Sequence, residues 1–166
     1  GVKAAGGRVL APVRVLAQAM GAQVCWNQAT GVVRVTGGGG EQADGRADAL
    51  YWLSRIVSAE SRGEPLEGQI AVANVVLNRV RSEGFPDSVY AVIFDERWGG
   101  QFTPVRNGTI HQEPAAQSVT AARMALDGAD AAGESLYFLA PDKAENFWVM
   151  ENRTFVKIIG SHWFYK

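Results

Sequence analysis

Glu60 is the residue of this chain whose type and spacing best fit acid–base chemistry. Four apolar residues before it recur at the three- and four-residue spacing of one helix face: Leu50, Leu53, Ile56 and Val57. Glu60 continues this stripe, so its carboxyl group should lose hydration and have a raised pKa. Such an acid can donate a proton near neutral pH, as a general acid must. The alternative, which the spacing leaves open, is a structural glutamate that pairs with Arg62 or with a backbone donor.

The other carboxylates and nucleophiles carry weaker signals. Glu64 and Glu67 stand at the start of a helix that Pro65 opens, where a negative charge stabilises the helix dipole, so a structural role is favoured for both. Loop carboxylates are expected to be solvated charges: Asp95, Glu96, Glu113, Asp142 and Glu145. His111 and His162 are far apart and the chain has one cysteine, so we expect no metal site and no cofactor.

Aromatic side chains and two asparagines suggest where a ligand could bind. The second half of the chain is rich in aromatic residues: Trp98, Phe102, Tyr137, Phe138, Phe147, Trp148, Trp163 and Tyr165. Aromatic rings stack on sugar faces, so a glycan cleft is one interpretation and core packing is the other. Asn74 and Asn78 lie four residues apart in a predicted helix, where asparagine is unfavourable without a partner. They could line a cleft or satisfy buried backbone groups.

The elements that must position these residues form one mainly helical domain, predicted over residues 47–166. Helices are predicted in four places: 48–60, 65–80, 89–94 and 115–126. Short aromatic and β-branched runs predict a small β element: 135–139, 147–150, 155–159 and 162–165. Residues 98–114 are predicted to be a long loop, which inside a domain is usually functional or mobile.

A glycine-rich stretch separates this domain from a small N-terminal unit. Four consecutive glycines at 37–40 cannot hold regular structure at low cost, so residues 37–46 are predicted to be a linker. Residues 1–36 are predicted to form a β-α-β-β unit, whose elements follow in this order: strand 8–10, helix 12–20, strand 23–26 and strand 32–35. Because a unit of this size buries little core, we expect it to dock on the rest of the chain or on a partner.

The composition fits a globular domain that acts on neither nucleic acid nor a membrane. The 166 residues are 47% hydrophobic and include 16 basic and 17 acidic side chains, a formal net charge of −1. A substantial core is therefore expected, and the balanced charge argues against nucleic acid and anionic membranes as partners. No apolar run approaches the roughly 18–20 residues of a membrane span. Composition does not indicate an oligomeric state.

Residues 56–80, IVSAESRGEPLEGQIAVANVVLNRV, resemble the signature of the SleB/CwlJ-type cell wall hydrolases, the spore cortex-lytic enzyme family. Six later segments resemble this family in the same order: Phe85-Pro86, Val92-Ile93-Phe94, Gln101-Phe102-Thr103, Ala121-Ala122-Arg123, Leu136-Tyr137-Phe138 and Ile159-Gly160-Ser161-His162. The resemblance covers the chain from about residue 50 onward. It implies an α+β fold with a mainly helical, lysozyme-like catalytic domain, and it places the family's catalytic glutamate on Glu60.

The resemblance also implies a substrate and a place of action. It points to cleavage of peptidoglycan glycan strands between N-acetylmuramic acid and N-acetylglucosamine, in spore cortex or vegetative wall. This implies an exported protein of the cell wall or spore envelope. Five residues, which lie in the matched segments or could line a glycan cleft, are expected to bind substrate: Gln101, Phe102, Thr103, Tyr137 and Asn78.

The number of carboxylates bears on the reaction type. Glycosidases ordinarily use two, whereas this sequence marks only Glu60, so we expect a lytic transglycosylase in which substrate groups supply the second function. The alternatives are a hydrolytic muramidase, an N-acetylmuramoyl-L-alanine amidase and a non-catalytic wall-binding module.

Residues 8–27 resemble part of another module, the copper amine oxidase N-terminal domain, which occurs as a non-catalytic appendage of bacterial surface proteins. Nothing in these residues indicates copper binding, and they include no candidate catalytic group. We therefore expect bond cleavage to depend on residues 47–166 alone.

Overall fold

The computed structural model of the chain describes residues 3–5, 8–10, 23–27, 32–36, 41–97, 102–144 and 146–166. Contacts divide it into two units, Gly1–Ala47 and Asp48–Lys166, which are described separately. The first unit has two antiparallel strand pairs: β1 (Lys3–Ala5) with β2 (Arg8–Leu10), and β3 (Gln23–Asn27) with β4 (Val32–Thr36). The three predicted strands are confirmed and β1 is an addition, while the predicted helix 12–20 lies outside the described residues.

The helix that carries Glu60, α2 (Glu41–Ser61), begins earlier than the sequence pattern predicts. Residues 41–46 were expected to belong to the linker, but they form its first turns, whereas residues 37–40 lie outside the described part of the chain. Most residues between Glu41 and Leu50 are good helix formers, and one glycine among them costs only about 1 kcal/mol. The division of the chain into 1–36, 37–46 and 47–166 stays a prediction.

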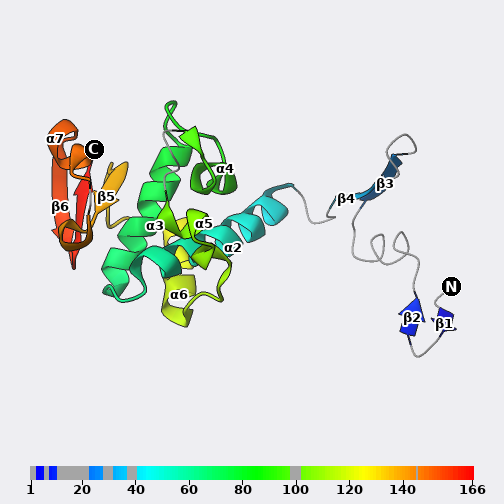
Figure 1. Ribbon diagram of the computed structural model, residues 1–166. Helices are drawn as coiled ribbons and strands as arrows, with labels where there is room; N and C mark the ends of the chain where they lie inside the picture. The colour runs from blue at the N-terminus through cyan, green and yellow to red at the C-terminus, as the bar shows by residue number, and fades with distance from the viewer. Residues whose placement is uncertain are drawn as a thin grey trace. The chain divides into compact units, whose positions relative to one another are not determined.

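Helix α3 (Leu66–Val80) is the centre of the second unit. It is buried almost all round, as expected for a helix that packs against neighbours on several sides. Its neighbours are α4 (Val89–Ile93), α6 (Ala116–Leu126) and the sheet. Figure 1 shows the sheet at one end of this unit, α3 next to it, and α2 and α4 beyond. The four predicted helices are therefore all present, with bounds that differ by a few residues except at the start of α2.

A three-stranded antiparallel sheet has the order β5-β7-β6. Strand β7 (His162–Tyr165) is central, between β5 (Tyr137–Leu139) and β6 (Phe155–Ile159). Most of β7 is buried, whereas Phe155 and Ile158 of the edge strand β6 are each about half exposed. The turn between β6 and β7 contains Gly160 at φ 59°, a left-handed conformation that favours glycine. The small β element of the predicted fold is thus confirmed.

Residues 148–150 belong to a helix instead of the extended segment that the aromatic and β-branched composition of residues 147–150 predicts. Helix α7 (Trp148–Asn152) begins where the side chain of Asn146 accepts a hydrogen bond from the Trp148 backbone N–H at 2.8 Å. Asn152 Nδ2 also donates to the Trp148 carbonyl at 2.9 Å. These local side-chain contacts override strand propensity, which is weak evidence for short segments.

The predicted loop 98–114 is more regular than expected. It contains α5 (Thr103–Arg106) and the 3-10 helix η2 (Thr109–His111), while residues 98–101 lie outside the described part. A second 3-10 helix, η3 (Pro141–Lys143), follows β5. The predicted class, α+β and mainly helical, is confirmed.

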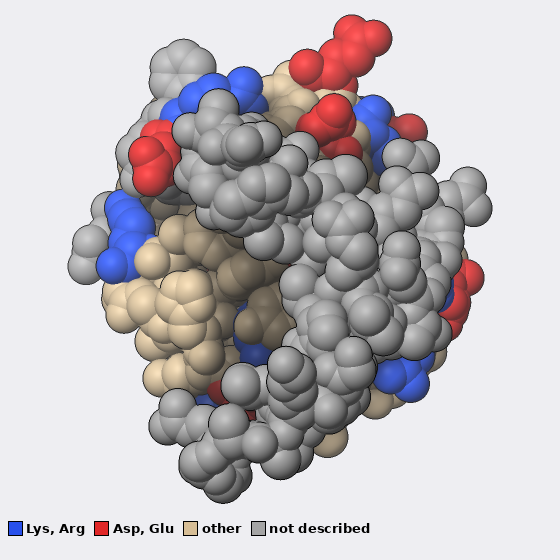
Figure 2. Space-filling model, turned by 90° about the vertical axis from the view of Figure 1, so that its right-hand side faces the viewer, with Lys and Arg blue, Asp and Glu red and all other residues tan. Residues whose placement is uncertain are grey.

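Two further features concern the length of the helices and the charge of the surface. Among the described residues, no helix is both long and apolar enough to cross a membrane. On the face shown in Figure 2, described basic and acidic side chains are interspersed around the rim, in keeping with the net charge of −1.

Candidate active site

Glu60 lies in the last turn of α2, on the edge of the core. Leu53, Ile56 and Val57, the apolar residues of its stripe, have no solvent exposure, and Glu60 itself is partly buried. Burial raises the pKa of Glu60 from 4.5 to about 7, because a carboxylate loses hydration there. The burial of Glu60 in the structure thus agrees with the raised pKa that the sequence pattern predicts, and it keeps a protonated form of Glu60 accessible near neutral pH.

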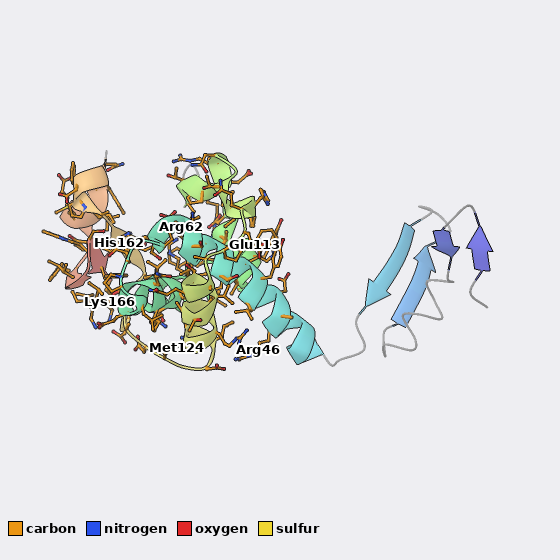
Figure 3. The ribbon with its side chains drawn as sticks, turned by 90° about the horizontal axis from the view of Figure 1, so that it is seen from below. Arg46, Arg62, Glu113, Met124, His162 and Lys166 are labelled. Atoms are coloured by element: carbon orange, nitrogen blue, oxygen red, sulfur yellow. The ribbon has the colours of Figure 1, made fainter. Side chains whose placement is uncertain are left out.

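A cleft of about 310 Å³ opens beside Glu60. One wall comes from the end of α2 and the residue after it: Arg55, Ser58, Ala59, Glu60 and Arg62. The other wall comes from α5, η2 and the residues that follow them: Thr103, Pro104, Asn107, Thr109, Gln112 and Glu113. Figure 3 shows Arg62 and Glu113 beside α2. The cleft therefore presents hydroxyl, amide and guanidinium groups around one acid that is poised to give up a proton.

Polar contacts hold the two walls together. Ser58 Oγ accepts a hydrogen bond from the Ala115 backbone N–H at 3.0 Å, and Arg62 Nη2 donates to the same oxygen at 3.4 Å. One turn earlier in α2, Arg55 Nη2 forms an ion pair with Glu113 Oε2 at 3.4 Å. The Arg55 side chain is 12% exposed, whereas that of Glu113 is 90% exposed. The segment 113–115 is thus joined to α2 at two positions that precede Glu60.

The turn after Glu60 is fixed by the buried side chain of Gln69 on α3. Gln69 Nε2 donates to the carbonyl of Glu64 at 3.0 Å and to that of Arg62 at 3.4 Å. Ser118 Oγ of α6 donates in turn to Gln69 Oε1 at 2.8 Å. Because both ends of the Gln69 amide have partners, the backbone that leaves Glu60 is held in one conformation.

Glu64 connects this turn to the sheet. Its carboxylate accepts hydrogen bonds from the Ser161 backbone N–H at 2.9 Å and from the Ser161 hydroxyl, and it lies 3.9 Å from His162 Nδ1. A Cβ added to Gly160 would lie 1.9 Å from Glu64 Oε2, so any other residue here would push this carboxylate out of its present position. Glu64 therefore has a structural role, as expected, but its partner is the β6–β7 turn and not the start of α3.

The comparisons with known proteins agree with this architecture. The sequence model described as Cell Wall Hydrolase matches residues 63–165, which is more than half of the chain. This chain belongs to the cell wall hydrolase family. The resemblance that the motifs indicate is thereby confirmed. The sequence model of the copper amine oxidase N-terminal domain matches residues 2–43, so the second resemblance is confirmed too.

Two curated relatives match most of the second unit of this chain in sequence. Over 117 residues the chain is 44% identical to the spore cortex-lytic enzyme of Oceanobacillus iheyensis and 43% identical to that of Bacillus cereus. These matches cover 70% of this chain but only 41% and 44% of the two relatives, so the chain spans less than half of their length.

Two solved catalytic domains share the fold. The structure of the catalytic domain of the germination-specific lytic transglycosylase SleB from Bacillus anthracis matches with a TM-score of 0.65 and 41% identity. The match covers 72% of this chain and 94% of that domain. The catalytic domain of SleB from Bacillus cereus gives a TM-score of 0.64 at 41% identity, over 72% of this chain and 91% of that domain.

Of the five predicted substrate-binding residues, Thr103 is the one that lines the cleft among the described residues. Its Oγ1 accepts a hydrogen bond from Arg106 Nη2 at 3.1 Å. Phe102, which directly precedes it, is 3% exposed and belongs to the hydrophobic core beside Phe138, with ring centroids 6.5 Å apart. Gln101 lies outside the described residues.

Tyr137 and Asn78 have other neighbours and are not among the described residues that line the cleft. The Tyr137 ring contacts two guanidinium groups, with Arg153 at 4.9 Å and Arg79 at 5.5 Å from its centroid. Asn78 Nδ2 donates to the carbonyls of Gly133 at 2.6 Å and of Ser135 at 3.0 Å. These contacts support the packing and backbone-satisfying alternatives for both residues.

Several cleft residues carry no signal that sequence analysis could detect. Arg55 lies on α2 five residues before Glu60, but a helix of this length offers many exposed charges. Asn107, Gln112 and Glu113 come from the segment predicted as a loop, where polar residues are ordinary. Glu113 in particular was expected to be a solvated charge, which its exposure confirms, yet it is the second carboxylate among the described cleft residues.

No site for a metal ion is evident in the part of the chain that the structure describes, where no three His, Cys, Asp or Glu side chains gather. The chemistry of the described cleft residues is therefore that of one proton donor, one exposed carboxylate and several hydrogen-bond donors.

Proposed function

We propose that this chain cleaves the glycan strands of peptidoglycan between N-acetylmuramic acid and N-acetylglucosamine, with Glu60 as the general acid. The observation that carries the proposal is an acid with a pKa of about 7 on the wall of a polar cleft. Relatives named spore cortex-lytic enzymes and a solved lytic transglycosylase domain of the same fold support the substrate class. The polar groups of the cleft suit a ligand rich in hydroxyl and acetamido groups.

The first step is a proton transfer. Protonated Glu60 donates its proton to the glycosidic oxygen, so that the bond from this oxygen to C1 of N-acetylmuramic acid breaks and the leaving sugar departs with a hydroxyl group. Positive charge develops at C1, where the neighbouring 2-acetamido group of the substrate can stabilise it. This step needs one acid, and Glu60 is in the correct protonation state near neutral pH.

The second step decides the product. In a lytic transglycosylase, the carboxylate of Glu60 takes the proton from the C6 hydroxyl of N-acetylmuramic acid as that oxygen bonds to C1. The acid is regenerated, no water is incorporated, and the product carries a 1,6-anhydro end. We favour this outcome because Glu64 is held by Ser161 and is not available as a second carboxylate.

Hydrolysis is the second candidate, and Glu113 is the observation that favours it. Glu113 lies in the same cleft as Glu60, its side chain is 90% exposed, and a carboxylate in this position could activate water. Against this, Glu113 is paired with Arg55, which orients it toward the guanidinium. Glu113 therefore replaces Glu64 as the residue to test for a second carboxylate.

The deciding experiment is a digest of purified spore cortex and vegetative peptidoglycan in oxygen-18 water, followed by mass spectrometry. We expect soluble fragments with anhydro ends, each lighter than the reducing sugar by one water, and no oxygen-18. Reducing ends that contain oxygen-18, together with loss of activity in Glu113→Gln, would establish the hydrolase instead. Release of peptide stems would establish an amidase, and absence of any product would leave a binding module.

We also propose that the chain acts outside the cytoplasmic membrane, in the cell wall or spore envelope, because that is where peptidoglycan lies. The N-terminal residues 1–36 are proposed to be an appendage that is not needed for bond cleavage. Immunolabelling of intact spores and cells tests the location, and a chain that begins at Glu41 tests the appendage. Loss of activity in a folded chain of this kind would show that the N-terminal residues help to form the active site.

A further inference from the structure

Four ring side chains form an exposed surface next to the cleft, called here the aromatic surface: Tyr51, Trp52, Tyr90 and His111. Trp52 lies in the middle, with its ring centroid 4.9 Å from that of Tyr51 and 5.4 Å from that of Tyr90. Tyr51 is 47% exposed and Tyr90 is 48% exposed. The Tyr90 ring also stacks on Phe94, with centroids 4.5 Å apart, so one face of Tyr90 is supported by the domain. The surface is therefore held by ring contacts and open to solvent.

The aromatic surface is continuous with the cleft in two places. The guanidinium of Arg55, a cleft residue, lies 3.8 Å from the centroid of the Tyr51 ring. His111 lies between the cleft residues Thr109 and Gln112 in the sequence, and its ring is 6.3 Å from that of Trp52. A polymer that leaves the cleft on the side of Arg55 thus meets this surface next.

The distance along α2 places this surface beyond the bond that is cleaved. Tyr51 precedes Glu60 by nine residues, which is roughly 13.5 Å along a helix with a rise of 1.5 Å per residue. Tyr51 is therefore too far from Glu60 to contact the reacting sugar, and Tyr90 joins the same surface through Trp52. A sugar that meets this surface would belong to a more distant part of the strand.

Packing alone does not account for these two tyrosines. Phe102 and Phe164 show what core aromatic residues look like in this domain, with exposures of 3% and 0%. Tyr51 and Tyr90 instead keep nearly half of their surface in water, although one side of each ring is already held by Arg55 or Phe94. A contiguous exposed aromatic surface is typical of a binding site. Sugar rings stack on such faces through their C–H groups, and the phenol hydroxyls can bond to sugar hydroxyls.

We propose that the aromatic surface is a distal sugar-binding subsite, which extends the cleft and holds a glycan strand several sugars away from the bond at Glu60. The inference rests on the proposed function and adds a substrate property to it. The enzyme binds long strands more tightly than short ones, because only a long strand reaches from the cleft to Tyr51 and Tyr90. A rigid ring loses little conformational entropy on binding, which makes it an effective contact.

The test compares strand lengths in a background that binds without cleaving. Glu60→Gln is combined with Tyr51→Leu and Tyr90→Leu, and binding is measured by calorimetry with purified peptidoglycan fragments of one disaccharide and of six or more. We expect the substitutions to weaken binding of the long strands about three- to tenfold per tyrosine, as the loss of one aromatic contact does, and to leave the short strands unchanged. In the active enzyme, KM for long strands should rise while kcat stays the same.

Two sets of controls separate the subsite from general damage. Tyr51→Phe and Tyr90→Phe keep the rings and should keep most of the long-strand affinity. Trp148→Leu and Phe155→Leu remove aromatic residues of α7 and β6 that are 47% and 50% exposed, and they should not change binding at either length.

Several results would overturn the inference. Equal losses for short and long strands, or no loss for either, would show that the aromatic surface does not bind sugar. A dimer in sedimentation experiments that the two leucine substitutions dissociate would assign the surface to a second copy of the chain. Because binding is measured without cleavage, a wild-type chain that binds long strands through these tyrosines but releases no product would refute the proposed function and leave this inference standing.

Discussion

Replacing Glu60 with glutamine should stabilise the folded chain at neutral pH, by an amount that grows as the pH rises. Glu60 has a pKa of about 7 in the folded chain because burial removes water from the carboxylate, against 4.5 for a solvated glutamate. The folded chain therefore binds the Glu60 proton more tightly than the unfolded chain does. The contribution of Glu60 to the free energy of unfolding is therefore largest below pH 4.5, falls between pH 4.5 and about 7, and changes little at higher pH.

The size of the effect follows from the two pKa values. The difference between 4.5 and about 7 corresponds to about 3 kcal/mol, at about 1.4 kcal/mol per pH unit. Glutamine has nearly the same shape as glutamate and cannot ionise, so the variant does not lose this stability as the pH rises. The stability of Glu60→Gln relative to wild type should thus increase by about 3 kcal/mol between pH 4 and pH 8, with most of the change between the two pKa values.

Urea denaturation of both chains at several pH values measures this difference directly. The matched control is Glu113→Gln, which removes a carboxylate from the same cleft whose side chain is 90% exposed. Its pairing with Arg55 is that of a surface ion pair, so the control should change stability by less than about 1 kcal/mol. If the difference between Glu60→Gln and wild type is the same at pH 4 and pH 8, Glu60 is not desolvated in the folded chain and the basis for its role as an acid is lost.

Three further predictions concern activity and packing. Glu60→Gln should lower turnover by about 10²–10⁴-fold, because glutamine cannot donate a proton. Wild-type turnover should also fall as the pH rises above about 7, where Glu60 loses its proton. Turnover that stays constant above this pH would contradict the role of Glu60 as the acid. Glu113→Gln should keep turnover within about tenfold of wild type if the reaction is transglycosylation, in contrast to the near-total loss expected of a second catalytic carboxylate. Gly160→Ala should lower the free energy of unfolding by about 1–2 kcal/mol, since φ is 59° and the Glu64 carboxylate must move away from the new Cβ; denaturant titration that shows no change would mean that the turn adapts freely.

Local periodicity was sufficient to predict the part of the site that lies on α2. The apolar stripe ends on Glu60 within one helix, so the burial of this carboxyl group follows from residues that are close in the sequence. The central helix α3 was predictable for the same reason, because Pro65 marks its start and apolar residues continue through it. In both cases the relevant interactions are made within a few turns.

The opposite wall of the cleft could not be predicted, because it is brought to α2 by tertiary packing. Ser58 and the Ala115 backbone N–H are 57 residues apart, and Arg55 and Glu113 are 58 apart. The same limit applies to Asn78, whose amide reaches carbonyls 55 and 57 residues away. Neither a polar loop residue nor a mid-helix asparagine identifies its distant partner, so sequence alone left the cleft and packing alternatives open.

The hydrogen bonds between Glu64 and Ser161 have a consequence for how the domain folds. They join positions 97 residues apart, so a long loop of chain must close before they can form. Contacts of such long range slow folding, whereas α2 and α3 contain the local contacts that form quickly. The turn after Glu60 is therefore complete only once the β6–β7 turn has reached Glu64. We expect a partly folded chain to carry Glu60 on a formed helix before these hydrogen bonds exist, so the proposed activity should require the folded sheet as well as α2.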